Sequence, residues 1–193
     1  MTRRGLSVGT RSVLFGAHQF AIHPWFVAAA WWRLYGFPWD PRLWVAFFVH
    51  DLGYVGKPDI DGAEGETHPE LGARIMGRLF GAGWGDFCLL HSRFYARRRG
   101  RPYSRLCAAD KLATAMTWLW LYLPMVRLTA ELAEYRAGRA TPSKGWTDRD
   151  GETDWEWARR VQDYCRRWAF EHRDGREDTW TAATAPSSAP EVP

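Results

Sequence analysis

The sequence contains little cysteine, and this scarcity excludes a protein held together by disulfides. Its three cysteines, Cys88, Cys107 and Cys165, are odd in number and widely spaced, and none belongs to a Cys-x-x-Cys pair. Such a set provides no disulfide framework. It is typical of a chain that folds in a reducing compartment, so we expect a cytoplasmic protein.

Long apolar runs are also missing. The most apolar stretch, Met116 to Val126, has about half the length needed to span a bilayer, and it contains Pro124. The basic N-terminus is not followed by the apolar run and small-residue cleavage site of a signal peptide. The sequence therefore predicts no transmembrane segment and a buried helix over 116–126, with peripheral membrane contact as the alternative.

Runs of alternating β-branched residues, which are typical of strands, are absent, whereas helical periodicity is present throughout. The sequence therefore predicts an all-α protein. Asp40 and Pro41 form a good helix start, and Thr67 with Glu70 has the spacing of a capping box. Loops are expected over 52–66, which is acidic and rich in glycine, and over 138–151. We expect helices over residues 12–22, 23–35, 40–51, 67–80, 84–95, 104–134 (bent at Pro124) and 153–172.

The 193 residues suit one well-buried core and are too few for two ordinary domains. We therefore expect one helical domain over residues 1–172. Its last amphipathic helix, 153–172, should leave His172 on the surface. The segment 173–193, rich in Ala, Pro, Ser and Thr, predicts a disordered tail.

Aromatic residues and arginines are abundant. The 13 tryptophans could fill the core or form the wall of a ligand pocket, and composition alone does not separate these possibilities. The formal net charge is +4, and arginines are concentrated in one short segment. This concentration indicates an anionic partner or a solvated basic face. The clustered residues are Arg93, Arg97, Arg98, Arg99, Arg101 and Arg105.

Histidines and aspartates stand at helix ends and loops in an order that indicates a metal site. Asp51 follows an apolar helix, where a carboxylate is costly to bury without a partner, and a cation would supply one. A structural ion pair is the alternative for His50, Asp51 and Asp110. Imidazole and carboxylate together suit Fe, Mn, Zn, Co or Mg. We expect one or two divalent ions, held by His23, His50, Asp51, His68, His91 and Asp110.

The motifs around these residues resemble one known family. They are His23-Pro-Trp-Phe-Val, an apolar helix ending in His50-Asp51-Leu-Gly, His68 at a helix start, Leu-Leu-His91 and Cys-Ala-Ala-Asp110-Lys-Leu. Over about residues 18–120 they resemble the HD superfamily of metal-dependent phosphohydrolases, with a layout similar to its YqeK-type bis-nucleoside tetraphosphate hydrolases. The resemblance implies a helical bundle around two ions bridged by Asp51. His23, His50 and Asp110 would bind one ion, and His68 and His91 the other.

The sequence departs from this family at Tyr54, where many relatives have Lys or Glu. Lys57 lies one helical turn further on, in a loop. His18 is an alternative to His23 as the first metal ligand. If His23 is the ligand, His18 would line the pocket or form a hydrogen bond with a ligand residue. His68 could instead only cap its helix. The resemblance therefore implies a metal site in this chain, but it does not identify the substrate.

The sequence predicts a phosphohydrolase that acts on a nucleotide or other small phosphorylated metabolite through a metal-activated water. Asp51, Lys57, Arg93 and Lys111 are the catalytic candidates. An HD-type di-iron oxidase, which has the same ligands, is one alternative. A non-catalytic nucleotide- or nucleic-acid-binding module that stacks bases on Phe94, Tyr95 and Tyr103 is another, although we expect no specific nucleic-acid binding. The substrate-binding candidates are His18, Tyr54, Tyr95, Arg97 and Arg101.

Overall fold

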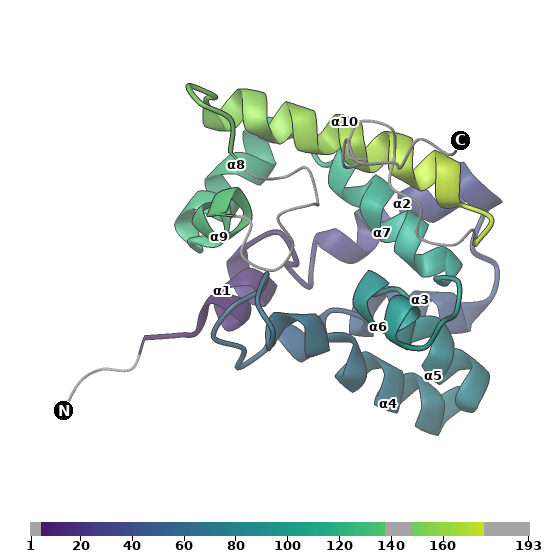
Figure 1. The fold of residues 1–193 in the computed structure, drawn as a ribbon. Helices are drawn as coiled ribbons and strands as arrows, with labels where there is room; N and C mark the ends of the chain where they lie inside the picture. The colour runs from purple at the N-terminus through teal and green to yellow at the C-terminus, as the bar shows by residue number, and fades with distance from the viewer. Residues whose placement is uncertain (1–4, 138–147, 176–193) are drawn as a thin grey trace, which may run out of the picture.

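The computed structural model describes residues 5–137 and 148–175, and every regular element within these ranges is helical (Figure 1). The predicted all-α class is therefore confirmed. Short 3-10 turns, Leu52–Tyr54 and Gly65–Thr67, lie in the predicted loop between α3 and α4. The α-helices are α1 (Val8–Phe15), α2 (His23–Tyr35), α3 (Pro41–Val49), α4 (Pro69–Phe80), α5 (Ala82–Leu89), α6 (Arg93–Arg98), α7 (Arg105–Met116), α8 (Leu119–Leu128), α9 (Glu131–Ala137) and α10 (Asp154–His172).

Helices with clear local start signals lie where the sequence predicts them. The carboxylate of Asp40 accepts a hydrogen bond from the Arg42 amide at the start of α3. Thr153 and Glu156 form a reciprocal capping box at the start of α10. The capping box predicted at Thr67 is wrong, because His68 occupies the N-cap of α4 and the Thr67 hydroxyl instead donates to the Glu64 carbonyl.

Three predicted helices differ from the structure. The helix expected over 12–22 is shorter and earlier, ending as α1 at Phe15. The helix expected over 84–95 is divided into α5 and α6 by a turn at residues 90–92. The helix expected over 104–134 is divided into α7, α8 and α9, with breaks at residues 117–118 and 129–130, while Pro124 lies inside α8. Ala130 adopts φ 67°, which ends α8.

The break between α7 and α8 is stabilised from a distant part of the chain. The side-chain amide of Gln162, on α10, donates to the carbonyls of Thr114 (3.0 Å) and Thr117 (2.6 Å). Arg166 donates to the Ala115 carbonyl at 3.1 Å. These α10 donors bind carbonyls that lack helical partners at the end of α7.

Helix α7 packs between α2 and α10, and α4 packs against α5 and α3 (Figure 1). The largest side chains of the core include Trp157, Trp168 and Phe47, each fully buried. His172 is also buried, contrary to the surface position expected from the sequence, because its ring stacks on Trp168 with centroids 4.4 Å apart. No described helix is long and apolar enough to cross a bilayer. The loop residues 138–147 and the tail residues 176–193 lie outside the described ranges.

Two glycines allow α3 and α4 to approach closely. A Cβ on Gly72 would lie 2.7 Å from the Val49 carbonyl oxygen, and one on Gly53 would lie 1.9 Å from the carbonyl oxygen of His68. Both contacts are to backbone, which cannot swing aside as a flexible side chain can. The absence of a side chain at Gly53 therefore allows the turn that follows Asp51 to pack directly against the backbone of His68.

We expect Gly53→Ala to lower the free energy of unfolding by at least about 2 kcal/mol, because the added methyl overlaps the backbone at the start of α4. Denaturant titration measures the change. Gly83→Ala is the matched control, since a Cβ there meets no atom within 4 Å, and α5 should gain up to about 1 kcal/mol from the better helix former. Equal effects of the two substitutions would contradict the close approach at Gly53.

Candidate metal centre

The six residues predicted as metal ligands come together from five separate places along the chain. His23 begins α2, His50 and Asp51 follow α3, and His68 precedes α4. His91 lies in the turn between α5 and α6, and Asp110 is in the middle of α7. Their ligand atoms form two groups, each with all atoms within 4.8 Å of one another, and Asp51 belongs to both. Either group could hold a metal ion.

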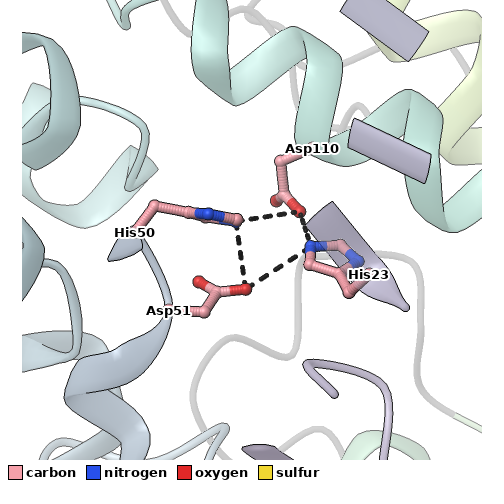
Figure 2. Close-up of side chains that lie close together, drawn as sticks. All are labelled: His23, His50, Asp51 and Asp110. Carbon is pink, nitrogen blue, oxygen red and sulfur yellow. Dashed lines mark hydrogen bonds and ion pairs between the residues drawn. The ribbon is translucent and has the colours of Figure 1, made fainter. Parts of the chain in front are cut away.

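The first group contains His23, His50, Asp51 and Asp110, whose side chains point toward one another (Figure 2). Nε2 of His23 lies 3.1 Å from Oδ1 of Asp110 and 3.5 Å from Oδ2 of Asp51. Nε2 of His50 lies 3.1 Å from the same Asp51 oxygen. Ligand atoms about 2.1 Å from one tetrahedral ion stand roughly 3.4 Å apart, so these spacings suit a shared cation.

The second group uses the other oxygen of Asp51. Oδ1 lies 3.6 Å from Nε2 of His68 and 3.5 Å from Nε2 of His91, and the two nitrogens are 3.1 Å apart. One carboxylate thus directs Oδ2 to the first group and Oδ1 to the second. A carboxylate so placed could contribute one oxygen to each group.

Backbone carbonyls orient three of the imidazoles. Nδ1 of His50 lies 2.9 Å from the Phe47 carbonyl, that of His68 lies 2.8 Å from Gly65, and that of His91 lies 2.5 Å from Cys88. Each carbonyl belongs to the residue three positions earlier in the chain. Because a carbonyl only accepts, Nδ1 must donate a proton, and Nε2 of each ring faces the centre.

The buried charges of the centre call for a cation. Nε2 of His50 and Oδ2 of Asp51 are buried without a hydrogen-bond partner, a costly state that a cation between them would relieve. Although burial opposes protonation, the carboxylates of Asp51 and Asp110 raise the pKa of His50 to about 10. Burial and the His91 ring hold the pKa of His68 well below its ordinary value, which keeps that ring in its ligating form.

The centre opens into a cavity of about 880 Å³. Basic side chains of α6 and α7 line one part of the wall, and acidic and phenolic side chains line another. In the part of the chain that the structure describes, no tryptophan lines this cavity, so the tryptophans fill the core or lie at the surface. Besides the ligands, the polar lining residues include Arg93, Arg97, Arg98, Lys111, Asp61, Glu66, Tyr54, Tyr122, Tyr135 and His18.

His18 lies beside the centre and outside both ligand groups. Its Nδ1 is 2.7 Å from the Ser12 hydroxyl and 3.6 Å from Oε1 of Glu131. Glu131 is fully buried and also accepts a hydrogen bond from the Ala17 amide at 2.9 Å. Tyr54 lies between two histidines, with its ring centroid 4.5 Å from His18 and 4.0 Å from His68. The position that differs from the family pattern thus packs against a candidate ligand.

Three of the residues predicted to act in catalysis or substrate binding lie outside the cavity lining. The ammonium of Lys57 donates to the Thr67 hydroxyl at 2.6 Å. The Tyr95 hydroxyl donates to the carboxylate of Glu70, which is therefore unavailable for the predicted capping box. Arg101 binds Asp86, which also binds Arg99. Tyr95 and Arg101 were expected at the site because the helix predicted over 84–95 runs straight into a loop, whereas α6 forms a separate short helix. Lys57 was expected there because of its spacing from Asp51.

The structure adds residues that the sequence analysis did not select. Arg98 lines the cavity as the last residue of α6, next to Arg97. Tyr122 and Tyr135 reach the cavity from α8 and α9. The arginine cluster was a signal for Arg98, whereas the two tyrosines depend on helix breaks that have no clear local pattern.

Comparison of the chain with protein-family models, curated proteins and solved structures gives no match. The functional argument therefore depends on the residues and geometry described above. What they define is an all-helical protein with a buried histidine–aspartate cluster that could bind two metal ions.

The metal content of protein purified without chelator, measured in variants, tests each of the two ligand groups separately. Asp51→Ala should lose both ions, because its carboxylate belongs to both groups, whereas His68→Ala should lose mainly one. His172→Gln is the control, since this buried histidine on α10 belongs to neither group and its replacement should leave metal content unchanged. Full metal content in His68→Ala would contradict the second site.

Proposed function

We propose that this protein is a metal-dependent phosphohydrolase of the HD type, which cleaves a phosphate ester or anhydride in a nucleotide or other small phosphorylated metabolite. The observation that carries the proposal is the position of Asp51. Its two oxygens face two ligand groups at one end of a cavity with basic side chains in its wall. The order of the ligands along the chain, similar to the HD pattern, supports the same assignment.

The residues suit attack on phosphorus by water. Divalent ions held by the two groups would supply a water whose pKa is lowered toward neutrality. Asp51 would hold its two oxygens toward both ions, while the imidazoles, fixed by backbone carbonyls, would keep their positions during the reaction. Cationic side chains of the wall would stabilise the charge that develops on the phosphoryl oxygens.

Arg93 is the best-placed arginine for this role. It lines the cavity, one of its terminal nitrogens donates to the Tyr164 hydroxyl at 3.1 Å, and its guanidinium lies 5.2 Å from the centroid of the Trp168 ring. These contacts with α10 restrict the side chain, so that little conformational entropy is lost when it binds phosphate. A planar guanidinium can donate two parallel hydrogen bonds to phosphoryl oxygens.

Lys111 provides a second positive charge beside the first ligand group. Its ammonium lies 3.8 Å from Oδ2 of Asp110. Although burial opposes the charge, the carboxylate of Asp110 raises the pKa of Lys111, so the side chain stays protonated at neutral pH. The role we assign to Lys111 is to neutralise charge on the leaving group.

The nucleic-acid-binding alternative has less support. Tyr95 and Tyr103, which would stack on bases, are buried, and Tyr103 packs against Trp168 with ring centroids 5.0 Å apart. Arg99 and Arg101 both bind Asp86. The arginine cluster is therefore divided between the cavity wall and a surface ion pair, and it does not form one open basic face.

A screen of phosphorylated metabolites for phosphate release, on protein of known metal content, tests the proposed function. We expect release from at least one nucleotide or small phosphate ester, and loss of that activity in Asp51→Ala. Two iron atoms per chain without any phosphate release would contradict the proposal and favour the di-iron oxidase.

On the substrate so identified, we expect Arg93→Ala to lower kcat/KM by about a hundredfold, since a donor to the phosphoryl oxygens is lost. Arg101→Ala is the matched control, because this arginine belongs to the same cluster but binds Asp86 outside the cavity. Metal content should be unchanged in both variants. Small and equal effects would place phosphate recognition elsewhere, at Lys111 or Arg97.

A further inference from the structure

Several large aromatic side chains are exposed together on one part of the surface. On an ordinary protein surface, exposed apolar residues are scattered singly. Trp39 is 84% exposed and Trp120 is 66% exposed. These residues lie on α2, on the segment that joins it to α3, on α3 and at the start of α8. We call this set the aromatic face: Trp25, Trp32, Phe37, Trp39, Phe48, Trp118 and Trp120.

Ring contacts connect the members of the aromatic face. Phe37 contacts both Trp32 and Trp39, with centroids 5.7 Å and 4.5 Å away. Trp25 lies seven residues before Trp32, so the two share one side of α2. Phe26, the next residue, contacts Trp118 at 6.1 Å, and Trp118 stacks on Trp120 at 5.4 Å. The face therefore extends from the α2–α3 segment across α2 to α8.

Basic side chains predominate over acidic ones around the aromatic face. The chain has no acidic residue in segments 1–39 and 112–130, which supply α2 and α8. Asp40, beside the exposed Trp39, is held by the Arg42 guanidinium at 2.7 Å. Arg33 is exposed next to Trp32. The side chains that can meet a partner here are thus aromatic or basic, which is complementary to an apolar surface with negative charge.

A groove continues the face toward α10 and adds further arginines. Its volume is about 630 Å³, and it is lined by Arg33, Trp120, Trp155, Arg159 and Arg166 among others. Its acidic member, Asp163, binds Arg166 at 2.9 Å. The groove thus combines aromatic rings with guanidinium groups, the two side-chain types that suit the apolar and phosphate parts of a phospholipid.

We propose that the aromatic face docks on a bilayer that contains anionic phospholipid. The tryptophan rings enter the interfacial region, which tryptophan prefers, and Arg33 and Arg159, which line the groove, bind headgroup phosphates. The contact is peripheral, since no described helix could cross a bilayer. A second copy of the chain is a poorer occupant, because Asp40 and Asp163, the carboxylates at the rim, already bind arginines of their own chain.

Co-sedimentation of the full chain with vesicles tests this proposal independently of any enzymatic activity. We expect binding to phosphatidylcholine vesicles that contain phosphatidylglycerol, and much weaker binding to phosphatidylcholine alone or at high salt. The double variant Trp32→Ser, Trp39→Ser should bind at least about tenfold more weakly. Arg33→Gln should bind about fivefold more weakly.

Leu79→Ser is the matched control, because Leu79 on α4 is 60% exposed, close to the 62% of Trp32, and lies outside the aromatic face. It should bind vesicles like the unmodified chain, and all variants should keep their helical content. Absence of binding to either vesicle would overturn the proposal, as would an equal loss in Leu79→Ser. A dimer in sedimentation equilibrium that the tryptophan variant dissociates, without vesicle binding, would assign the face to self-association instead.

Discussion

The burial of the Asp51 carboxylate is the constraint on which the surrounding structure depends. This side chain is 10% exposed and has four imidazoles within 3.6 Å of its oxygens. A carboxylate so placed is unfavourable unless positive charge compensates it. Three of these imidazoles donate their Nδ1 proton to a backbone carbonyl, so that Nε2 faces the carboxylate and could bind a cation beside it. Backbone carbonyls three residues earlier in the chain hold those rings in place without any additional side chain.

The ligand positions could be predicted because their signals are local. His23, His50 and His68 stand at helix boundaries marked by prolines, a capping aspartate and a change from apolar to glycine-rich sequence. The same signals predicted α2, α3 and α10 closely. His91 was selected by its order in the chain, although the turn that carries it was drawn as helix.

The helix breaks and much of the cavity wall could not be predicted because their causes lie far away in sequence. α7 ends where Gln162, 45 residues after Thr117, binds its carbonyls. Lys57 was chosen for its distance from Asp51 along the chain, but Thr67 holds it away from the cavity. Tyr122 and Tyr135 reach the cavity only because two breaks redirect the helices. Local pattern thus located the candidate ligands, whereas contacts between distant segments determine what surrounds them.

The hydrogen bond between Glu131 and the Ala17 amide has a consequence for the order in which the molecule can be assembled during synthesis. All six candidate ligands precede residue 111, but the wall that holds His18 depends on a carboxylate 114 residues after Ala17. A Cβ on Gly16 would lie 2.3 Å from that carboxylate, so the contact is tight. Arg93 likewise donates a hydrogen bond to the Tyr164 hydroxyl, which belongs to α10. A nascent chain can therefore contain every candidate ligand before it contains the residues of α9 and α10 that complete the wall around them.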